Sequence, residues 1–265
     1  AYGAIVANGA ACAEWNALLD AYAKDIGCDL EQLQARAAAL SSAVKLHEYT
    51  LKLLFYICLT RRAKGYYTER GLSEQLFFDT MMDIKYKLVE CREVYGICGT
   101  FVASWFVGFF KLTRFALGRL QFELVDFKHT YEKEGKKLTP ESRVINVHIP
   151  RTGTPIDKES CDKAYAAARE FFKGQAGENA PFVCHSWLLF PENKNILSPD
   201  SNTYRFMSEY DVVGWDYNLG EDLWRLFDTE EQNPERLPTN TRFRRLYAEH
   251  LKKGGRVGWG FGVKL

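Results

Sequence analysis

The sequence lacks the cysteine patterns that mark zinc modules and disulfide-rich secreted domains. Its seven cysteines are an odd number and form no Cys-x-x-Cys pair among 265 residues. This argues against a structural zinc site and against a disulfide framework. Several of the cysteines lie in apolar stretches with helical spacing, which is typical of reduced, buried thiols. We therefore predict a cytoplasmic protein without a metal site.

An excess of charge of either sign is also missing. The 35 basic and 34 acidic side chains give a formal net charge of +1, which favours neither nucleic acid nor an anionic membrane as a partner. The most apolar stretch, residues 98–112, is shorter than the roughly 20 residues that span a bilayer, so we expect a buried segment. The chain begins without Met and without a basic segment, and we expect no signal peptide there.

Helical spacing dominates the first part of the chain. Apolar side chains recur mostly three or four positions apart, which predicts apolar faces on two or more helices. These positions are Leu30, Leu33, Leu40, Val44, Leu51, Leu54, Ile57 and Cys58. Gly71 marks a helix end, and Ser73 is placed to cap a further helix that extends to about Arg92. We predict an all-helical N-terminal domain over residues 1–113.

The spacing changes to period two from residue 117 onward, as expected for half-buried strands. We predict strands at 117–127, 143–151, 182–190, 210–217 and 255–263, with helices at 155–173, 198–210, 219–228 and 240–253. Thr154 is the predicted N-cap of the first of these helices, with Pro155 at its first position. The charged region 128–142 is predicted to be a turn. Residues 114–265 should therefore form a mixed α/β sheet domain, and the fold class is α+β.

Three reactive side chains stand next to one another at Cys184, His185 and Ser186. Adjacent side chains of a strand point to opposite faces, so His185 is badly placed to activate either neighbour. A cysteine or serine hydrolase is therefore the weakest of the functional hypotheses. We interpret Cys184 as a small buried hydrophobe and keep His185 as the functional candidate of this stretch.

A cross-strand group is the better candidate for proton transfer. Glu123, His148 and His185 lie on three predicted strands of one domain. If strand pairing places them on one face, a carboxylate and two imidazoles would meet there, which suits acid–base chemistry near neutral pH. The alternative is a solvated sheet face, with His185 as a core histidine.

A phosphate-binding loop is a further candidate. Arg151, Thr152, Gly153 and Thr154 follow a predicted strand and precede a helix, where backbone N–H groups bind anions. Two features weaken this pattern, because Pro155 removes one donor and Asp157 places a negative charge in the first turn.

Several segments resemble a known family of bacterial acyltransferase-domain proteins. They are LGRLQFEL, VINVHIP, CDKAYAAAREFF, FVCHSWLL, SPDSNTYRF and HLKKGGRVGWGFG, together with YYTERGLSEQLFFDTMMDIKYKLVECREVYG in the first half. Members of this family join a helical N-acyltransferase N-terminal domain to a GNAT-like C-terminal domain. The resemblance implies a GNAT-like fold for residues 114–265.

The resemblance also implies transfer of an acyl group from acyl-CoA, with acetyl or a longer chain, to a small-molecule or peptide amine. It makes INVHIP the strand that splays from its neighbour and RTGT, residues 151–154, the pyrophosphate loop. It assigns Tyr204 as the acid for the departing thiolate and His148, His185 or Glu123 as the base. Only Gly153 matches the family's loop pattern, so a non-catalytic GNAT-like module that binds a ligand or protein stays open as the alternative.

Overall fold

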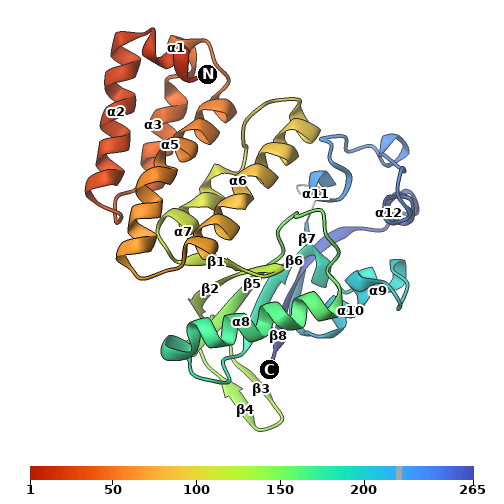
Figure 1. Ribbon diagram of the computed structural model, residues 1–265. Coiled ribbons are helices and arrows are strands. Elements are labelled where there is room, and N and C mark those ends of the chain that lie inside the picture. The colour runs from red at the N-terminus through yellow and green to blue at the C-terminus, as the bar shows by residue number, and fades with distance from the viewer. Residues whose placement is uncertain (219–222) are drawn as a thin grey trace. The chain divides into compact units, whose positions relative to one another are not determined.

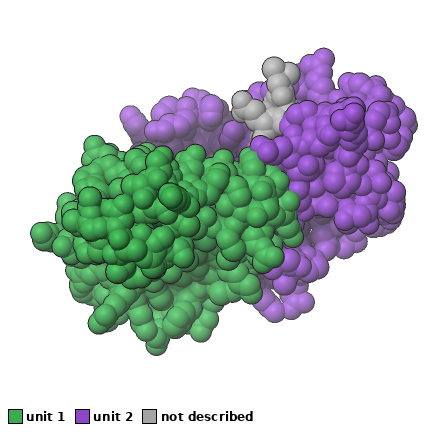
Figure 2. All heavy atoms as spheres, turned by 90° about the horizontal axis from the view of Figure 1, so that it is seen from above, with its two compact units in different colours: residues 1–115 green, residues 116–265 purple. Residues whose placement is uncertain are grey.

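The computed structural model describes residues 1–218 and 223–265. The chain forms two compact units, residues 1–115 and residues 116–265 (Figure 2). The first unit is helical and the second is built on a mixed sheet, which confirms the predicted α+β class. Each unit is described by itself.

Helices account for the regular structure of the first unit (Figure 1). They are α1 (Tyr2–Val6), α2 (Gly9–Lys24), α3 (Leu30–Ala39), α4 (Ser41–Val44), α5 (Glu48–Glu69), α6 (Glu74–Tyr95), a 3-10 turn (Ala103–Phe106) and α7 (Val107–Phe110). The predicted cap at Ser73 is confirmed, because its Oγ accepts a hydrogen bond from the N–H of Leu76 at 3.1 Å. Helix α6 continues to Tyr95 and ends at Gly96, whose φ of 70° suits a residue without a side chain.

Aromatic side chains fill the core of this unit. Trp15, Tyr22, Tyr56 and Phe110 are fully buried, and the hydroxyl of Tyr22 donates to the carbonyl oxygen of Phe110 at 2.8 Å. The apolar segment 98–112 therefore contributes core residues, as its length predicted. Within the residues that the structure describes, no helix is long and apolar enough to cross a membrane.

The second unit is a six-stranded sheet with helices and a small hairpin. The sheet order is β1-β2-β5-β6-β8-β7. Its strands are β1 (Arg114–Leu117), β2 (Leu120–Asp126), β5 (Arg143–His148), β6 (Phe182–Ser186), β7 (Asp211–Asn218) and β8 (Val257–Lys264). The helices are α8 (Lys158–Ala176), α9 (Asn193–Ile196), α10 (Asn202–Ser208), α11 (Leu223–Phe227) and α12 (Arg242–Lys252), with 3-10 turns at Trp187–Leu189 and Pro234–Arg236.

Several predicted boundaries are wrong for identifiable reasons. The predicted turn at 128–142 contains a hairpin of β3 (Tyr131–Lys133) and β4 (Lys136–Leu138), because Glu134 and Gly135 both take the positive φ of a tight hairpin turn. The predicted strand 182–190 ends at Ser186, whose Oγ accepts from the N–H of Leu188 and starts a 3-10 turn. Strand β1 and helix α9 were not predicted, and part of the predicted helix 219–228 falls at 219–222, outside the described residues.

The two faces of the sheet differ in what they carry. Helix α8 packs on one face of the sheet (Figure 1). The ring of Tyr165 on this helix lies 6.2 Å from that of Phe122 and 4.8 Å from that of Phe182. Because strand residues alternate, the opposite face carries the odd-numbered β2 and β6 residues, including Glu123 and His185. We call this opposite face the histidine face.

Strand β8 has glycine at alternate positions, so it carries no side chains there on the side that faces α8. A Cβ at Gly260 would lie 2.1 Å from the carbonyl oxygen of Leu189, and one at Gly258 would lie 2.4 Å from the ring of Phe190. The chain after β6 can therefore lie directly on the backbone of β8, which positions the last residues of β6.

Candidate functional site

The register between β2 and β5 creates the main polar group of the histidine face. Glu123 is paired with Asn146, and Gln121 with His148, in an antiparallel ladder. Directly paired residues of such a ladder share a face, so these four side chains project to the same side. The expectation that strand pairing brings Glu123 and His148 together is met by this register.

Glu123 and His148 are in direct contact. Nε2 of His148 lies 2.7 Å from Oε1 of Glu123, and the amide of Asn146 donates to the same oxygen at 3.1 Å. The two side chains are 17% and 16% exposed, so they remain within reach of a ligand. When Nε2 carries the proton that faces the carboxylate, the lone pair of the imidazole is on Nδ1. The pair therefore has the composition of an oriented general base.

The pair lies where two parallel strands part. The β5–β6 ladder joins Ile145 to Phe182 and Asn146 to Val183. Beyond this second pair β5 continues to His148 and β6 to Ser186, so both strands extend past the last residues that pair with each other. Strand backbone beyond the last paired residues is available to an extended ligand.

His185 stands two residues beyond the last pair on β6 and faces the same side as Val183. Its ring is exposed and lies 5.0 Å from that of Trp259 and 6.4 Å from that of Phe261. The structure therefore places His185 among aromatic rings of β8 and on the same face as the Glu123–His148 pair.

The loop before α8 is held by a residue that the sequence did not single out. Arg119 donates through Nε, Nη1 and Nη2 to the carbonyl oxygens of Pro155, Pro150 and Thr154, each at 3.0 Å. Gly153 has a φ of 82°, which favours glycine at that position. Arg119 lies in the tight turn after Gly118, and the only sequence signal was a basic residue beside that glycine.

The four predicted loop residues differ in their surroundings. The hydroxyls of Thr152 and Thr154 lie 2.7 Å apart, and the N–H of Thr154 donates to Thr152. Arg151 forms a two-pronged ion pair with Asp228, at 2.7 and 2.8 Å. Asp228 also contacts Arg244 closely. The charge of Arg151 is thus already paired in this structure.

The predicted N-cap at Thr154 is wrong. Helix α8 begins at Lys158, and Asp157 is its cap, since its carboxylate accepts from the N–H of Ser160 at 2.9 Å. Hydrogen bonds from the backbone and hydroxyl of Ser160 hold the pKa of the Asp157 carboxyl below its usual value. A carboxylate is stronger than a hydroxyl as an acceptor at a helix start, which explains why the cap moves three residues along the chain.

Tyr204, Cys184 and Ser186 do not lie on the histidine face. Tyr204 is on α10, which packs against α8, whereas Glu123 and His148 are on the histidine face. Cys184 is fully buried on the α8 side, and burial raises the pKa of its thiol. Ser186 is occupied as the cap of the following turn. This geometry offers His185 no adjacent nucleophile and gives the hydrolase hypothesis no support.

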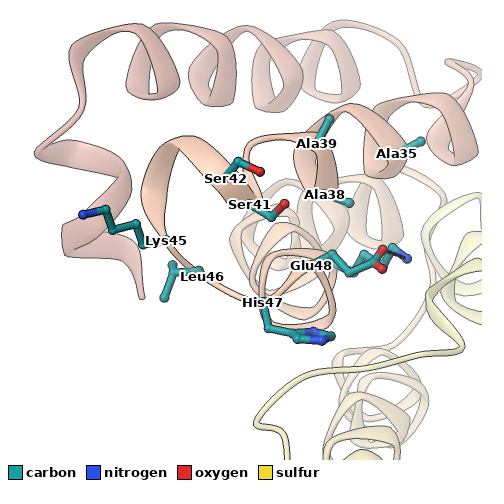
Figure 3. Close-up of a pocket in the computed structure, with 10 residues that line it drawn as sticks. Ala35, Ala38, Ala39, Ser41, Ser42, Lys45, Leu46, His47 and Glu48 are labelled. Carbon is teal, nitrogen blue, oxygen red and sulfur yellow. Dashed lines mark hydrogen bonds and ion pairs between the residues drawn. The ribbon is translucent and has the colours of Figure 1, made fainter.

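A separate hollow of about 700 Å³ lies in the helical unit (Figure 3). Three of its polar side chains have structural partners, because Glu48 pairs with Lys52 at 2.6 Å and Nδ1 of His47 caps α5 by accepting from the N–H of Tyr49. Over residues 1–218 and 223–265, no group of three or more His, Cys, Asp or Glu side chains is placed to hold a metal ion. The Glu123–His148 pair therefore remains the principal candidate for chemistry.

Comparison with known proteins agrees with this architecture. Residues 2–112 match the family described as an N-acyltransferase N-terminal domain, and residues 114–264 match the family described as a GNAT-like C-terminal domain. No curated protein matches the chain.

Crystal structures of an acyltransferase share the fold. Those with decanoyl-CoA and teicoplanin, and with CoA and 10C-teicoplanin, are each 20% identical to this chain, with a TM-score of 0.71. In both, the match covers 85% of this chain and 68% of the other. A third structure, with decanoyl-CoA alone, is 21% identical over 82% of this chain and 66% of the other, with a TM-score of 0.70. The chain belongs to the family of proteins that combine an N-acyltransferase N-terminal domain with a GNAT-like C-terminal domain.

Proposed function

We propose that the protein transfers an acyl group from an acyl-CoA thioester to an amine. The observation that carries the proposal is the Glu123–His148 pair at the point where β5 and β6 part. The family assignment supports it, and so do the acyltransferase structures of the same fold, which hold decanoyl-CoA and octanoyl-CoA. One of these structures also holds teicoplanin, a small molecule, which favours a small-molecule amine as the acceptor here. We further propose that the reaction takes place in the bacterial cytoplasm, in keeping with seven free thiols.

His148 is the proposed base. The acceptor reacts as the neutral amine, after its ammonium proton has gone to solvent, and its nitrogen forms a bond to the thioester carbonyl carbon. The adduct nitrogen then gives up an N–H proton to Nδ1 of His148, the resulting imidazolium is stabilised by the carboxylate of Glu123, and the C–S bond breaks. The CoA thiolate takes a proton from an acid, for which Tyr204 is the candidate. His185 is a second candidate for the proton transfer from the amine.

The loop 150–157 is the proposed site of the CoA pyrophosphate. Arg119 donates hydrogen bonds to three carbonyl oxygens of this loop. A loop that is ordered before the ligand arrives binds it with a smaller loss of entropy. Gly153, Thr152 and Thr154 are the proposed contacts. Arg151 contributes if the phosphates draw it away from Asp228, to which it is paired here.

Binding and turnover should be measured together. We expect micromolar binding of acetyl-CoA, octanoyl-CoA or decanoyl-CoA by titration calorimetry, also with desulfo-CoA, and weaker binding after Gly153→Glu, which adds a negative charge to the loop. With an amine present, release of the CoA thiol should fall sharply in His148→Gln, while binding of acyl-CoA is kept. A folded protein that binds none of these compounds would rule out the proposal.

A non-catalytic binding module is the second candidate. Two observations favour it, namely the Asp157 carboxylate at the start of α8 and the ion pair that occupies Arg151. Both place protein groups where an acyltransferase loop would receive phosphates. Tight binding of a ligand without release of CoA thiol from any amine would support this alternative.

A further inference from the structure

A pocket of about 700 Å³ lies on the histidine face of the second unit. Strands β6, β7 and β8 and the segment before β3 contribute its lining, which is His129, Thr130, His185, Val213, Gly214, Trp215, Asp216 and Phe261. A volume of this size is within the range that holds a small-molecule ligand. His185 belongs to this pocket and also to the face that carries the Glu123–His148 pair, so the pocket and the pair share one side of the sheet.

Gly214 on β7 leaves open space at the bottom of the pocket, which we call its floor. Gly214 is paired with Phe261, and a Cβ at Gly214 would meet no atom within 4 Å. The β7–β8 register shifts between Val212 and Gly214, so Val213 is the extra residue of a bulge. Bulges of this kind change the direction of side chains and are frequent beside binding sites.

Aromatic rings form one wall of the pocket. The ring of Phe261 lies 4.9 Å from that of His129 and 6.4 Å from that of His185. The segment with His129 is held in place by the next residues, since Asp211 accepts from the hydroxyl of Tyr131 at 3.1 Å and pairs with Lys133 at 3.3 Å. Burial and the nearby Asp211 raise the pKa of Tyr131 to about 12, which keeps it a donor.

Among the described residues that line the pocket, Asp216 carries the one formal charge at pH 7, with the histidines counted as neutral. Asp216 lies on the same side of β7 as Gly214 and therefore borders the open floor. None of the lining residues that the structure describes is a lysine or an arginine. Aromatic faces and one carboxylate together attract a cation attached to an apolar body.

We propose that this pocket binds an ammonium group of the acceptor other than the amine that is acylated, carried on an aromatic or apolar body, with the charge at Asp216 and the body over Gly214 and Phe261. Its role as acceptor site rests on the proposed acyltransferase function, whereas the binding itself does not. His185 lies on β6 at one edge of this pocket. It then separates the bound acceptor from the place where β5 and β6 diverge.

The test compares three ligands of nearly equal size by titration calorimetry without CoA, namely 2-phenylethylamine, 2-phenylethanol and 3-phenylpropionate. The amine should bind most tightly. Asp216→Asn should raise the Kd of the amine about threefold to fivefold, as expected for the loss of an exposed ion pair. The Kd of the alcohol should stay the same. Asp200→Asn removes an exposed carboxylate on another segment and is the matched control. It should change the Kd of neither the amine nor the alcohol.

A graded series at Gly214 tests the location. Gly214→Ala, Gly214→Val and Gly214→Leu fill the open floor progressively, and each should bind the amine and the alcohol less well than the one before. Circular dichroism and the melting temperature show whether each variant is folded. Equal binding of the amine by folded Gly214→Leu and by the wild type would overturn the proposal.

Acyl-CoA binding separates this proposal from the proposed function. If octanoyl-CoA and decanoyl-CoA lose affinity in Gly214→Leu while acetyl-CoA does not, the pocket holds the acyl chain, and the amine assignment is wrong. If no acyl-CoA binds the wild type but the amine still binds and responds to Asp216→Asn, the pocket assignment holds and the acyltransferase function fails.

Discussion

The guanidinium of Arg119 donates to the carbonyl oxygen of Thr154 at 3.0 Å, across 35 residues of chain. Two more loop carbonyls are bound in the same way. Arg119 is therefore a positioning residue for the loop that we assign to the CoA phosphates, and it need not contact the ligand itself.

Arg119→Ala should raise the KM for acyl-CoA more than it lowers kcat, because a released loop must be ordered at the moment of binding. We expect about a tenfold rise in the Kd of desulfo-CoA, measured by calorimetry. Arg119→Lys offers a compact ammonium group in place of the planar guanidinium fork and should recover only part of the affinity. A loss of kcat with unchanged KM would contradict a positioning role.

Glu123→Gln should lower kcat by about 10- to 1,000-fold, because the amide no longer stabilises an imidazolium on His148. The melting temperature should change little, since the amide can keep a hydrogen bond to the ring. Glu132→Gln on the exposed hairpin is the matched control and should leave thiol release unchanged. Full activity in Glu123→Gln would exclude this carboxylate from the chemistry.

Gly260→Ala and Gly174→Ala should have opposite effects on stability. A methyl group at 260 meets the backbone of Leu189, so we expect a loss of about 2–3 kcal/mol in the free energy of unfolding. At 174, inside α8, a Cβ meets nothing within 4 Å, and alanine should stabilise the helix by about 0.5–1 kcal/mol. Urea unfolding of both variants measures the difference, and a neutral Gly260→Ala would contradict the close approach.

Iodoacetamide should modify Cys98 and leave Cys184 intact in the folded protein. Cys98 is exposed, whereas Cys184 is fully buried and has a raised thiol pKa. Mass spectrometry of digested protein, with and without prior unfolding in urea, measures both sites in one sample. Rapid labelling of native Cys184 would return the cysteine hydrolase hypothesis to consideration.

Asp157→Asn should make the protein less sensitive to acid. The pKa of Asp157 is lowered in the folded state, so its carboxylate contributes stability above its unfolded pKa of about 3.9, and this contribution is lost as the pH falls through the lower folded value. Asparagine caps helices well but does not titrate in this range. Melting temperatures from pH 5 to pH 2 should fall less steeply in the variant. Asp200→Asn serves as the control.

Local signals in the sequence predicted much of the fold. The cap at Ser73 and the alternation of β2, β5 and β7 depend on neighbours within a few residues. The hairpin at 131–138 was missed because charged side chains hide its alternation. Thr154 was chosen as a cap because Pro155 follows it, although the stronger acceptor at Asp157 stood three residues away.

The candidate site was predictable only in part. The shared face of Glu123 and His148 was predictable because both lie on strands with clear alternation, and the face of His185 because neighbouring residues of a strand point to opposite sides. The binding of loop carbonyls by Arg119 and the pairing of Arg151 with Asp228 join residues 31 to 77 positions apart. Such pairs depend on how the strands and loops are arranged in space, and no short-range pattern contains that information.

The residues of strand β8 meet two different structural requirements at alternate positions. Its even positions 258, 260 and 262 are glycines that allow close backbone packing, while Trp259 and Phe261 lie beside His185 on the opposite side. A directed-evolution library can therefore vary the odd positions to change ligand preference and hold the even ones constant. On the proposal above, the odd positions form the part of this strand that recognises a ligand, and the even positions form its fixed structural part.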